Sequence, residues 1–176
     1  MWYIIGQIIG GIGVALFFIS YLCKTQKRLL FLQILGNAVM VLHFFLIGAK
    51  SGYILLIAGT IRNIIFYFSD NKYLSWKGIP YVLAGIIVGL GFLSWEAYYS
   101  LFIIVGLGLN TVFLSVKNVN ILKASVILTS ALILTYDAFA FSISGMINEA
   151  MAIVGAIIGL TVFYLTNKKQ KEIKEN

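Results

Sequence analysis

Residues 2–28 read WYIIGQIIGGIGVALFFISYLCKTQKR. No charged side chain occurs between 2 and 22, and Lys24, Lys27 and Arg28 follow at once. An apolar block of this length predicts a helix that crosses a hydrocarbon core of about 30 Å. The block lacks a basic leading segment and a small-residue cleavage site, so we expect a membrane-spanning helix rather than a cleaved signal peptide.

The rest of the chain repeats this pattern of apolar blocks and short polar breaks. Of its 176 residues, 61% are hydrophobic and 11% are charged, against about 45–50% and 25% in a soluble domain. The alternating segments of an outer-membrane barrel are absent. The sequence therefore predicts an all-α membrane protein with seven transmembrane helices. The predicted spans are Tyr3–Leu22, Leu29–Gly48, Tyr53–Ser69, Ile79–Trp95, Ala97–Val116, Ile121–Phe141 and Gly145–Leu165.

Basic residues predict the orientation of these spans. A net charge of +7 could indicate nucleic-acid binding in a soluble protein, but here the charges lie in connections and in the C-terminal tail. With the N-terminus outside, eleven of the thirteen basic residues are cytoplasmic, as the positive-inside rule requires. We expect a cytoplasmic C-terminus and no nucleic-acid partner. The eleven are Lys24, Lys27, Arg28, Lys72, Lys77, Lys117, Lys123, Lys168, Lys169, Lys171 and Lys174.

Seven spans divide naturally into three, one and three. Two three-helix repeats in the same orientation need one linking helix between them, and parallel repeats are a known transporter plan. At an offset of 93 residues, Ser51-Gly52 matches Ser144-Gly145, and His43 falls on Tyr136. The predicted organisation is a first repeat at 1–69, a linker helix at 70–96, a second repeat at 97–165 and a basic, disordered tail at 166–176.

Ionisable side chains inside spans are costly and usually face a bundle interior or a wet cavity. Helix rise puts three of them in one layer near the outer surface and the fourth, Arg62, deeper. We expect a water-accessible cavity between the repeats that binds a small polar or anionic ligand. In the alternative, Arg62 forms a structural ion pair with Glu149 or Asp137. The predicted site residues are His43, Arg62, Asn63, Asp137, Asn148 and Glu149.

Enzyme and metal motifs are missing from the sequence. The chain has one histidine, one cysteine (Cys23), no HExxH and no phosphate-binding loop. We therefore expect no enzyme activity, no cofactor and no metal site. The leading hypothesis is a small-molecule transporter or facilitator in the lipid bilayer. The alternatives are a non-transporting scaffold or sensor and, third, a membrane enzyme, which would need a nucleophile and a base within hydrogen-bond reach. Homo-oligomerisation is left open.

Two stretches carry a family resemblance: LHFFLIGAKSGYILLIAGTIRNIIF at 42–66 and YDAFAFSISGMINEAM at 136–151. They resemble the YgjV family of bacterial inner-membrane proteins, which has a similar His-Phe-Phe, Ile-Arg and a Glu in the last helix. The resemblance implies a bacterial inner-membrane location and no particular substrate. The three-one-three order is also similar to SWEET and PQ-loop transporters. This chain lacks their proline-glutamine pair, and its sole proline is Pro80 at the start of a span.

Overall fold

A computed structural model describes residues 2–21, 26–68, 77–114, 116 and 119–175. These residues form helices and contain no strand, which confirms the all-helical class, and each helix overlaps one predicted span. The helices are α1 (Trp2–Tyr21), α2 (Gln26–Ile47), α3 (Lys50–Tyr67), α4 (Ile79–Leu93), α5 (Ser100–Phe113), α6 (Val119–Phe139) and α7 (Ile143–Glu175).

Three of the helices are long and apolar enough to cross a membrane: α1, α2 and α7. Helices α4 and α5 are shorter but also apolar. Many large apolar side chains lie on the outer surface, and many polar side chains are buried. Soluble proteins show the opposite distribution. An apolar outer surface is the one that lipid solvates. Examples on the outer surface are Ile8, Phe45, Ile61, Ile86, Leu101, Leu128 and Val154.

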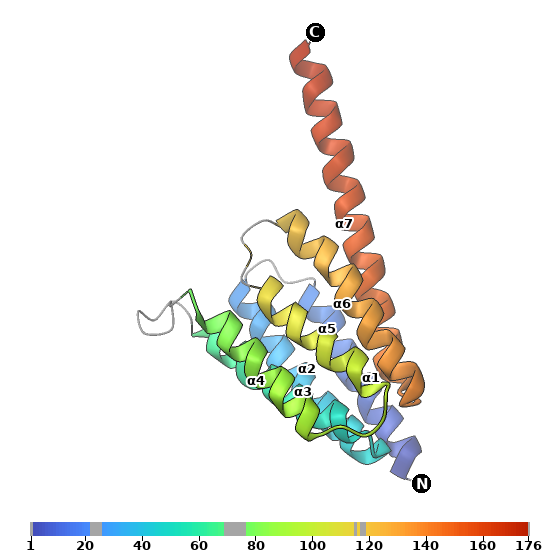
Figure 1. The fold of residues 1–176 in the computed structure, drawn as a ribbon. Coiled ribbons are helices and arrows are strands. Elements are labelled where there is room, and N and C mark those ends of the chain that lie inside the picture. Colours follow the sequence, from blue (N-terminus) through green and yellow to red (C-terminus); the bar gives the residue numbers. More distant parts are fainter. Residues whose placement is uncertain (1, 22–25, 69–76, 115, 117–118, 176) are drawn as a thin grey trace.

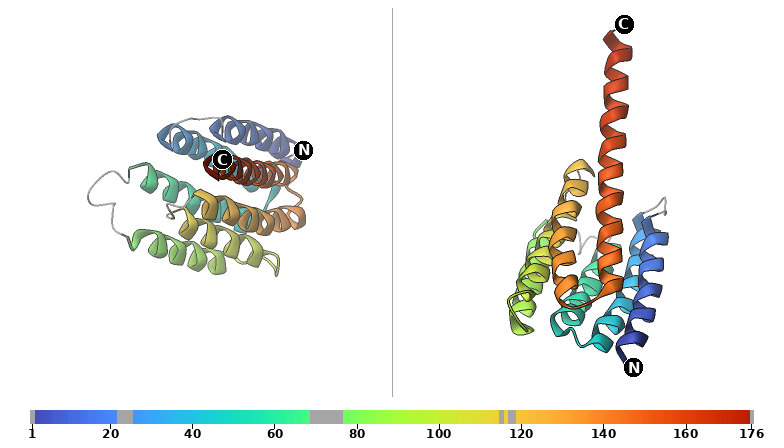
Figure 2. Two further views of the ribbon diagram at one scale, coloured as in Figure 1. Left: turned by 90° about the horizontal axis from the view of Figure 1, so that it is seen from above. Right: turned by 90° about the vertical axis from the view of Figure 1, so that its right-hand side faces the viewer.

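The helices run side by side, and α7 projects far beyond the others at its C-terminal end (Figure 1). Helix α2 packs between α1 and α3, α6 packs between α5 and α7, and α4 packs against α3 and α5. Helices α1–α3 form one set and helices α5–α7 a second, and the two sets meet where α1 contacts α7 and α3 contacts α5. Helix α7 therefore lies between the α1–α2 pair and the α4–α5 pair (Figure 2).

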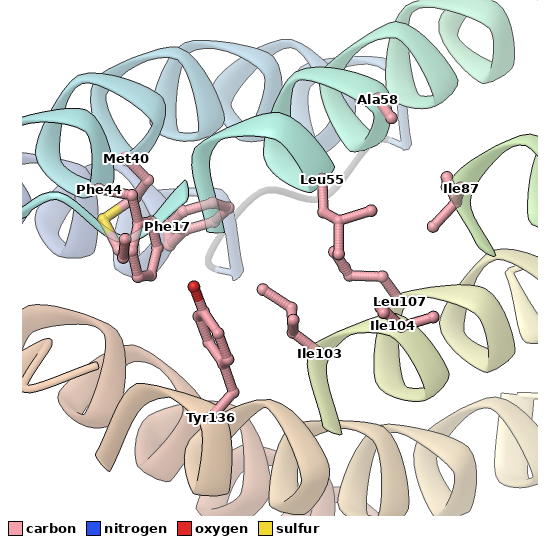
Figure 3. Close-up of a cluster of buried hydrophobic side chains, with 11 residues drawn as sticks. Phe17, Met40, Phe44, Leu55, Ala58, Ile87, Ile103, Ile104, Leu107 and Tyr136 are labelled. Carbon is pink, nitrogen blue, oxygen red and sulfur yellow. The ribbon is translucent and has the colours of Figure 1, made fainter. Parts of the chain in front are cut away.

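A layer of buried apolar side chains joins the two sets of helices. Phe17 and Phe44 face Tyr136 of α6, while Ile103 of α5 lies near Leu55 of α3 (Figure 3). Tyr136 is completely buried. We call the end of the bundle that holds the start of α1 and the α2–α3, α4–α5 and α6–α7 connections the N-terminal end.

Most helix boundaries differ from the predicted spans by a few residues, and two of the differences affect the argument. Helix α3 begins at Lys50 rather than Tyr53, so Arg62 lies about 18 Å from its start rather than the predicted ~13 Å. Helix α7 continues to Glu175, so the segment 166–175 is helical and the predicted disorder there is wrong. The extension is rich in Lys, Glu and Gln, which are good helix formers.

Candidate functional site

A buried arginine joins α3 to α5. The Arg62 guanidinium donates from Nε and Nη2 to Asn63 Oδ1 at 3.1 and 3.0 Å, and from Nη1 to Asn110 Oδ1 and Thr111 Oγ1, both at 3.0 Å. Thr111 Oγ1 in turn donates to the Leu107 carbonyl. Only 6% of Arg62 is exposed. We call Arg62, Asn63, Asn110 and Thr111 the arginine cluster.

Among the residues that the structure describes, the hydrogen-bond partners of this guanidinium are all neutral, so the predicted ion pair with Glu149 or Asp137 is wrong. None of its hydrogen bonds reaches either carboxyl group. The reason is the direction in which each side chain leaves its helix. Arg62 points from α3 toward α5. Glu149 on α7 accepts a hydrogen bond from Asn148 and bonds to Ser130 on α6. Within the described part of the chain, none of these hydrogen bonds compensates the positive charge of the arginine cluster.

A second group of polar side chains lies where α6 meets α7. His43 Nδ1 is 2.8 Å from the Gly6 carbonyl oxygen, and its Nε2 is 2.8 Å from Ser142 Oγ. A carbonyl only accepts, so Nδ1 carries a proton, and in the neutral ring Nε2 accepts from the Ser142 hydroxyl. His43 thus ties α1 and α2 to the start of α7.

Ser142 and His43 have the distance required of a nucleophile and its base. Both side chains are completely buried, however. Ser142 Oγ also accepts the Gly145 amide at 3.1 Å, and Gly145 is the third residue of α7. This is the geometry of an N-cap serine. Helix capping and inter-helix bonding account for the pair.

Two acidic side chains lie beside this cap. Asp137 is 1% exposed, and its Oδ1 has no hydrogen-bond partner. Its Oδ2 lies 2.6 Å from the position that a Cβ on Gly145 would occupy. Glu149 lies one helical turn beyond Gly145, on the same face of α7. We call Asp137, Ser142, Gly145, Glu149 and His43 the α6–α7 corner.

Two polar clasps close the N-terminal end of the bundle. In the first, Glu96 accepts the Lys50 and Ser51 amides at 2.8 and 2.9 Å, and Ser51 Oγ lies 2.9 Å from Ser100 Oγ. Glu96 therefore caps the start of α3. In the second, Ser144 Oγ donates to the Gln7 carbonyl at 2.9 Å. The first clasp joins α3 to α5, and the second joins α7 to α1.

Comparison with known families decides the identity. The model of the Imp-YgjV family, described as bacterial inner membrane protein, matches residues 4–167. The chain belongs to this family. No curated protein and no solved structure matches it. The assignment establishes a bacterial inner-membrane protein, and the matched range contains the arginine cluster and the α6–α7 corner.

In this Imp-YgjV protein, the six predicted site residues do not form one group. Arg62 and Asn63 lie with α5, whereas His43, Asp137, Asn148 and Glu149 lie around α6 and α7. The Gly52 amide donates to the Tyr136 hydroxyl at 2.8 Å, which places the start of α3 beside the corner. Arg62 is ten residues further along α3, or about 15 Å. The expected cavity between the repeats stays a prediction.

Sequence reasoning missed three members of these groups. Ser142 went unnoticed because it stands at a predicted span boundary, and Thr111 because threonine is common in membrane helices. Asn110 resembles the other asparagines and glutamines inside the spans, which commonly form hydrogen bonds between helices. The available signal was the adjacent pair Asn110-Thr111, which interrupts an apolar stretch.

Proposed function

We propose that this protein is a small-molecule transporter or facilitator that binds an anionic solute at the arginine cluster. The observation that carries the proposal is the buried Arg62, whose hydrogen bonds all go to neutral side chains. An arginine inside a bilayer costs at least about 2.5–3.5 kcal/mol on insertion scales, and such residues commonly mark substrate pathways. An anionic ligand would supply the missing counter-charge through a charge-assisted hydrogen bond to the guanidinium.

Two parallel three-helix repeats would provide the transport architecture, and the helix positions support them. Helices α2 and α6 begin at Gln26 and Val119, and α3 and α7 begin at Lys50 and Ile143, so each pair is 93 residues apart. The two connecting corners also correspond. Gly48 and Phe141, again 93 residues apart, have positive φ angles of 80° and 52°.

The first and second helices of each three-helix unit pack in the same way at positions 93 residues apart. A Cβ on Gly13 would meet the Met40 side chain and the Gly36 carbonyl, and a Cβ on Gly106 would meet the equivalent Ile133 and Thr129 positions. Glycine therefore allows the first helix of each unit to approach the second equally closely.

The two clasps support a two-fold relation between the units. The Ser51–Ser100 contact becomes the Ser144–Gln7 contact when each residue is exchanged for its equivalent 93 positions away. Such an exchange is expected of parallel repeats about an axis along the membrane normal. The proposed three-one-three order is similar to that of SWEET and PQ-loop transporters, although this chain lacks their proline-glutamine pair.

The proposed orientation puts the N-terminus outside and the C-terminus in the cytoplasm, on the basis of the lysine and arginine distribution. In that orientation the clasps and the α6–α7 corner face the outside. Arg62, about 18 Å along α3, then lies near the middle of a hydrocarbon core of about 30 Å. Transporter sites typically occupy this depth.

A binding screen tests the proposal. The purified protein is melted in detergent with small carboxylates and phosphates, because a ligand specific for the folded state adds about 2.7 kcal/mol at a hundred times its dissociation constant. We expect one class of anion to stabilise wild type and Lys50→Gln, which removes an exposed charge from the same helix, but not Arg62→Gln. Equal stabilisation of Arg62→Gln would refute the site. A scaffold would show no anion effect in any variant.

A further inference from the structure

The α6–α7 corner contains a carboxyl group with an unmet requirement. Asp137 is 1% exposed, and its Oδ1 is buried without a hydrogen-bond partner. An ionised carboxylate in an apolar environment is very costly, and in practice such a group becomes neutral instead. A second carboxyl group, Glu149, lies one helical turn beyond Gly145 on the same face of α7. A negative charge on Glu149 would raise the cost of ionising Asp137 further, so Asp137 holds a proton.

The groups that face Asp137 offer no positive charge to replace that proton. From α2, His43 has both ring nitrogens engaged by Gly6 and Ser142. The hydroxyl of the adjacent Tyr136 accepts a hydrogen bond from the Gly52 amide, and its ring packs against Tyr99. From α7 comes Glu149, itself acidic. Among the described residues, no group of three or more His, Cys, Asp or Glu side chains could hold a metal ion.

We propose that Asp137 binds one exchangeable proton at the α6–α7 corner, and that Glu149 is the neighbouring charge that shifts its titration. A carboxylate oxygen takes the proton from water to form an O–H bond, and release returns it to water. The α6–α7 corner is closely packed around Asp137. Gly145 has no side chain, so the first turn of α7 approaches Asp137, and Ser142 forms a hydrogen bond with His43. Proton exchange therefore requires this corner to open, which couples the protonation state to the position of α7 against α2.

Infrared spectroscopy tests the site without any solute. Purified protein is prepared with aspartate labelled by ¹³C at the carboxyl carbon. We expect a protonated-carboxyl band at neutral pH that shifts with the label, because Asp137 is one of two aspartates in the chain. The band should persist in labelled Asp70→Asn, vanish in Asp137→Asn and titrate at a different pH in Glu149→Gln.

Two results would overturn the proposal. One is a neutral-pH spectrum in which no protonated-carboxyl band responds to the aspartate label, which needs no variant to fold. The other is loss of the band when sodium replaces potassium at constant pH, which would make the corner a cation site. Neither result bears on anion binding by Arg62, because the measurement contains no solute.

Discussion

Gly145→Ala tests the packing of the α6–α7 corner most simply. The added Cβ would lie 2.5 Å from Ser142 Oγ and 2.6 Å from both Asp137 Cγ and Oδ2, where ordinary van der Waals contacts begin at 3.4 Å. The neighbours must retreat by about 0.8 Å in a close-packed interior, and overpacking of this kind costs about 1–3 kcal/mol. Retreat of Ser142 also stretches its 3.1 Å cap bond to the Gly145 amide, and a lost N-cap costs about 1 kcal/mol more.

The matched control is Gly155→Ala on the same helix, where an added Cβ meets nothing within 4 Å. Alanine is favoured over glycine inside a helix by about 0.5–1 kcal/mol, so this variant should be as stable as wild type or more stable. Free energies of unfolding are measured by titrating the detergent-solubilised protein with a denaturing detergent. We expect a loss of roughly 2–4 kcal/mol for Gly145→Ala, the sum of the overpacking and capping costs. Equal stability of the two variants would show that α7 does not pack against Asp137 and Ser142 as described.

Two further predictions concern a hydrogen bond and the topology. Tyr136→Phe leaves the buried Gly52 amide without its acceptor, so the free energy of unfolding should fall by about 1–3 kcal/mol. The control Tyr81→Phe, at an exposed position, should leave that free energy unchanged. An unchanged free energy of unfolding in Tyr136→Phe would show that this hydrogen bond does not join α3 to α6. In intact cells, an impermeant thiol reagent should label Glu96→Cys in a Cys23→Ser background but leave the native Cys23 unlabelled; the reverse pattern would invert the orientation.

Helix positions were largely predictable from the sequence because apolar runs mark them directly. The predicted span Leu29–Gly48 and the observed α2 differ by a few residues, since the charged start of α2 continues as helix before the apolar stretch begins. The extension of α7 to Glu175 could also have been predicted, because its residues favour helix even without apolar character. Weight given to charge alone led to the wrong expectation of disorder there.

Partners of the polar residues were much harder to predict. Depth along a helix follows from counting residues, and it suggested a pairing of Arg62 with Glu149. Depth says nothing about direction around the axis, and that direction turns Arg62 toward Asn110 and Thr111. Glu96 stands next to the predicted fifth span but caps α3, a contact across 46 positions that no local pattern indicates.

Counterflow in proteoliposomes tests the central claim most directly. Vesicles that contain the purified protein are loaded with an anion that stabilises it, and entry of the same labelled anion from outside is followed over time. We predict rapid exchange with wild type and Lys50→Gln and a rate no higher than in protein-free vesicles with Arg62→Gln. Binding of the anion without exchange in wild type would make this protein a sensor. Full exchange in Arg62→Gln would contradict the assignment of the arginine cluster as the solute site.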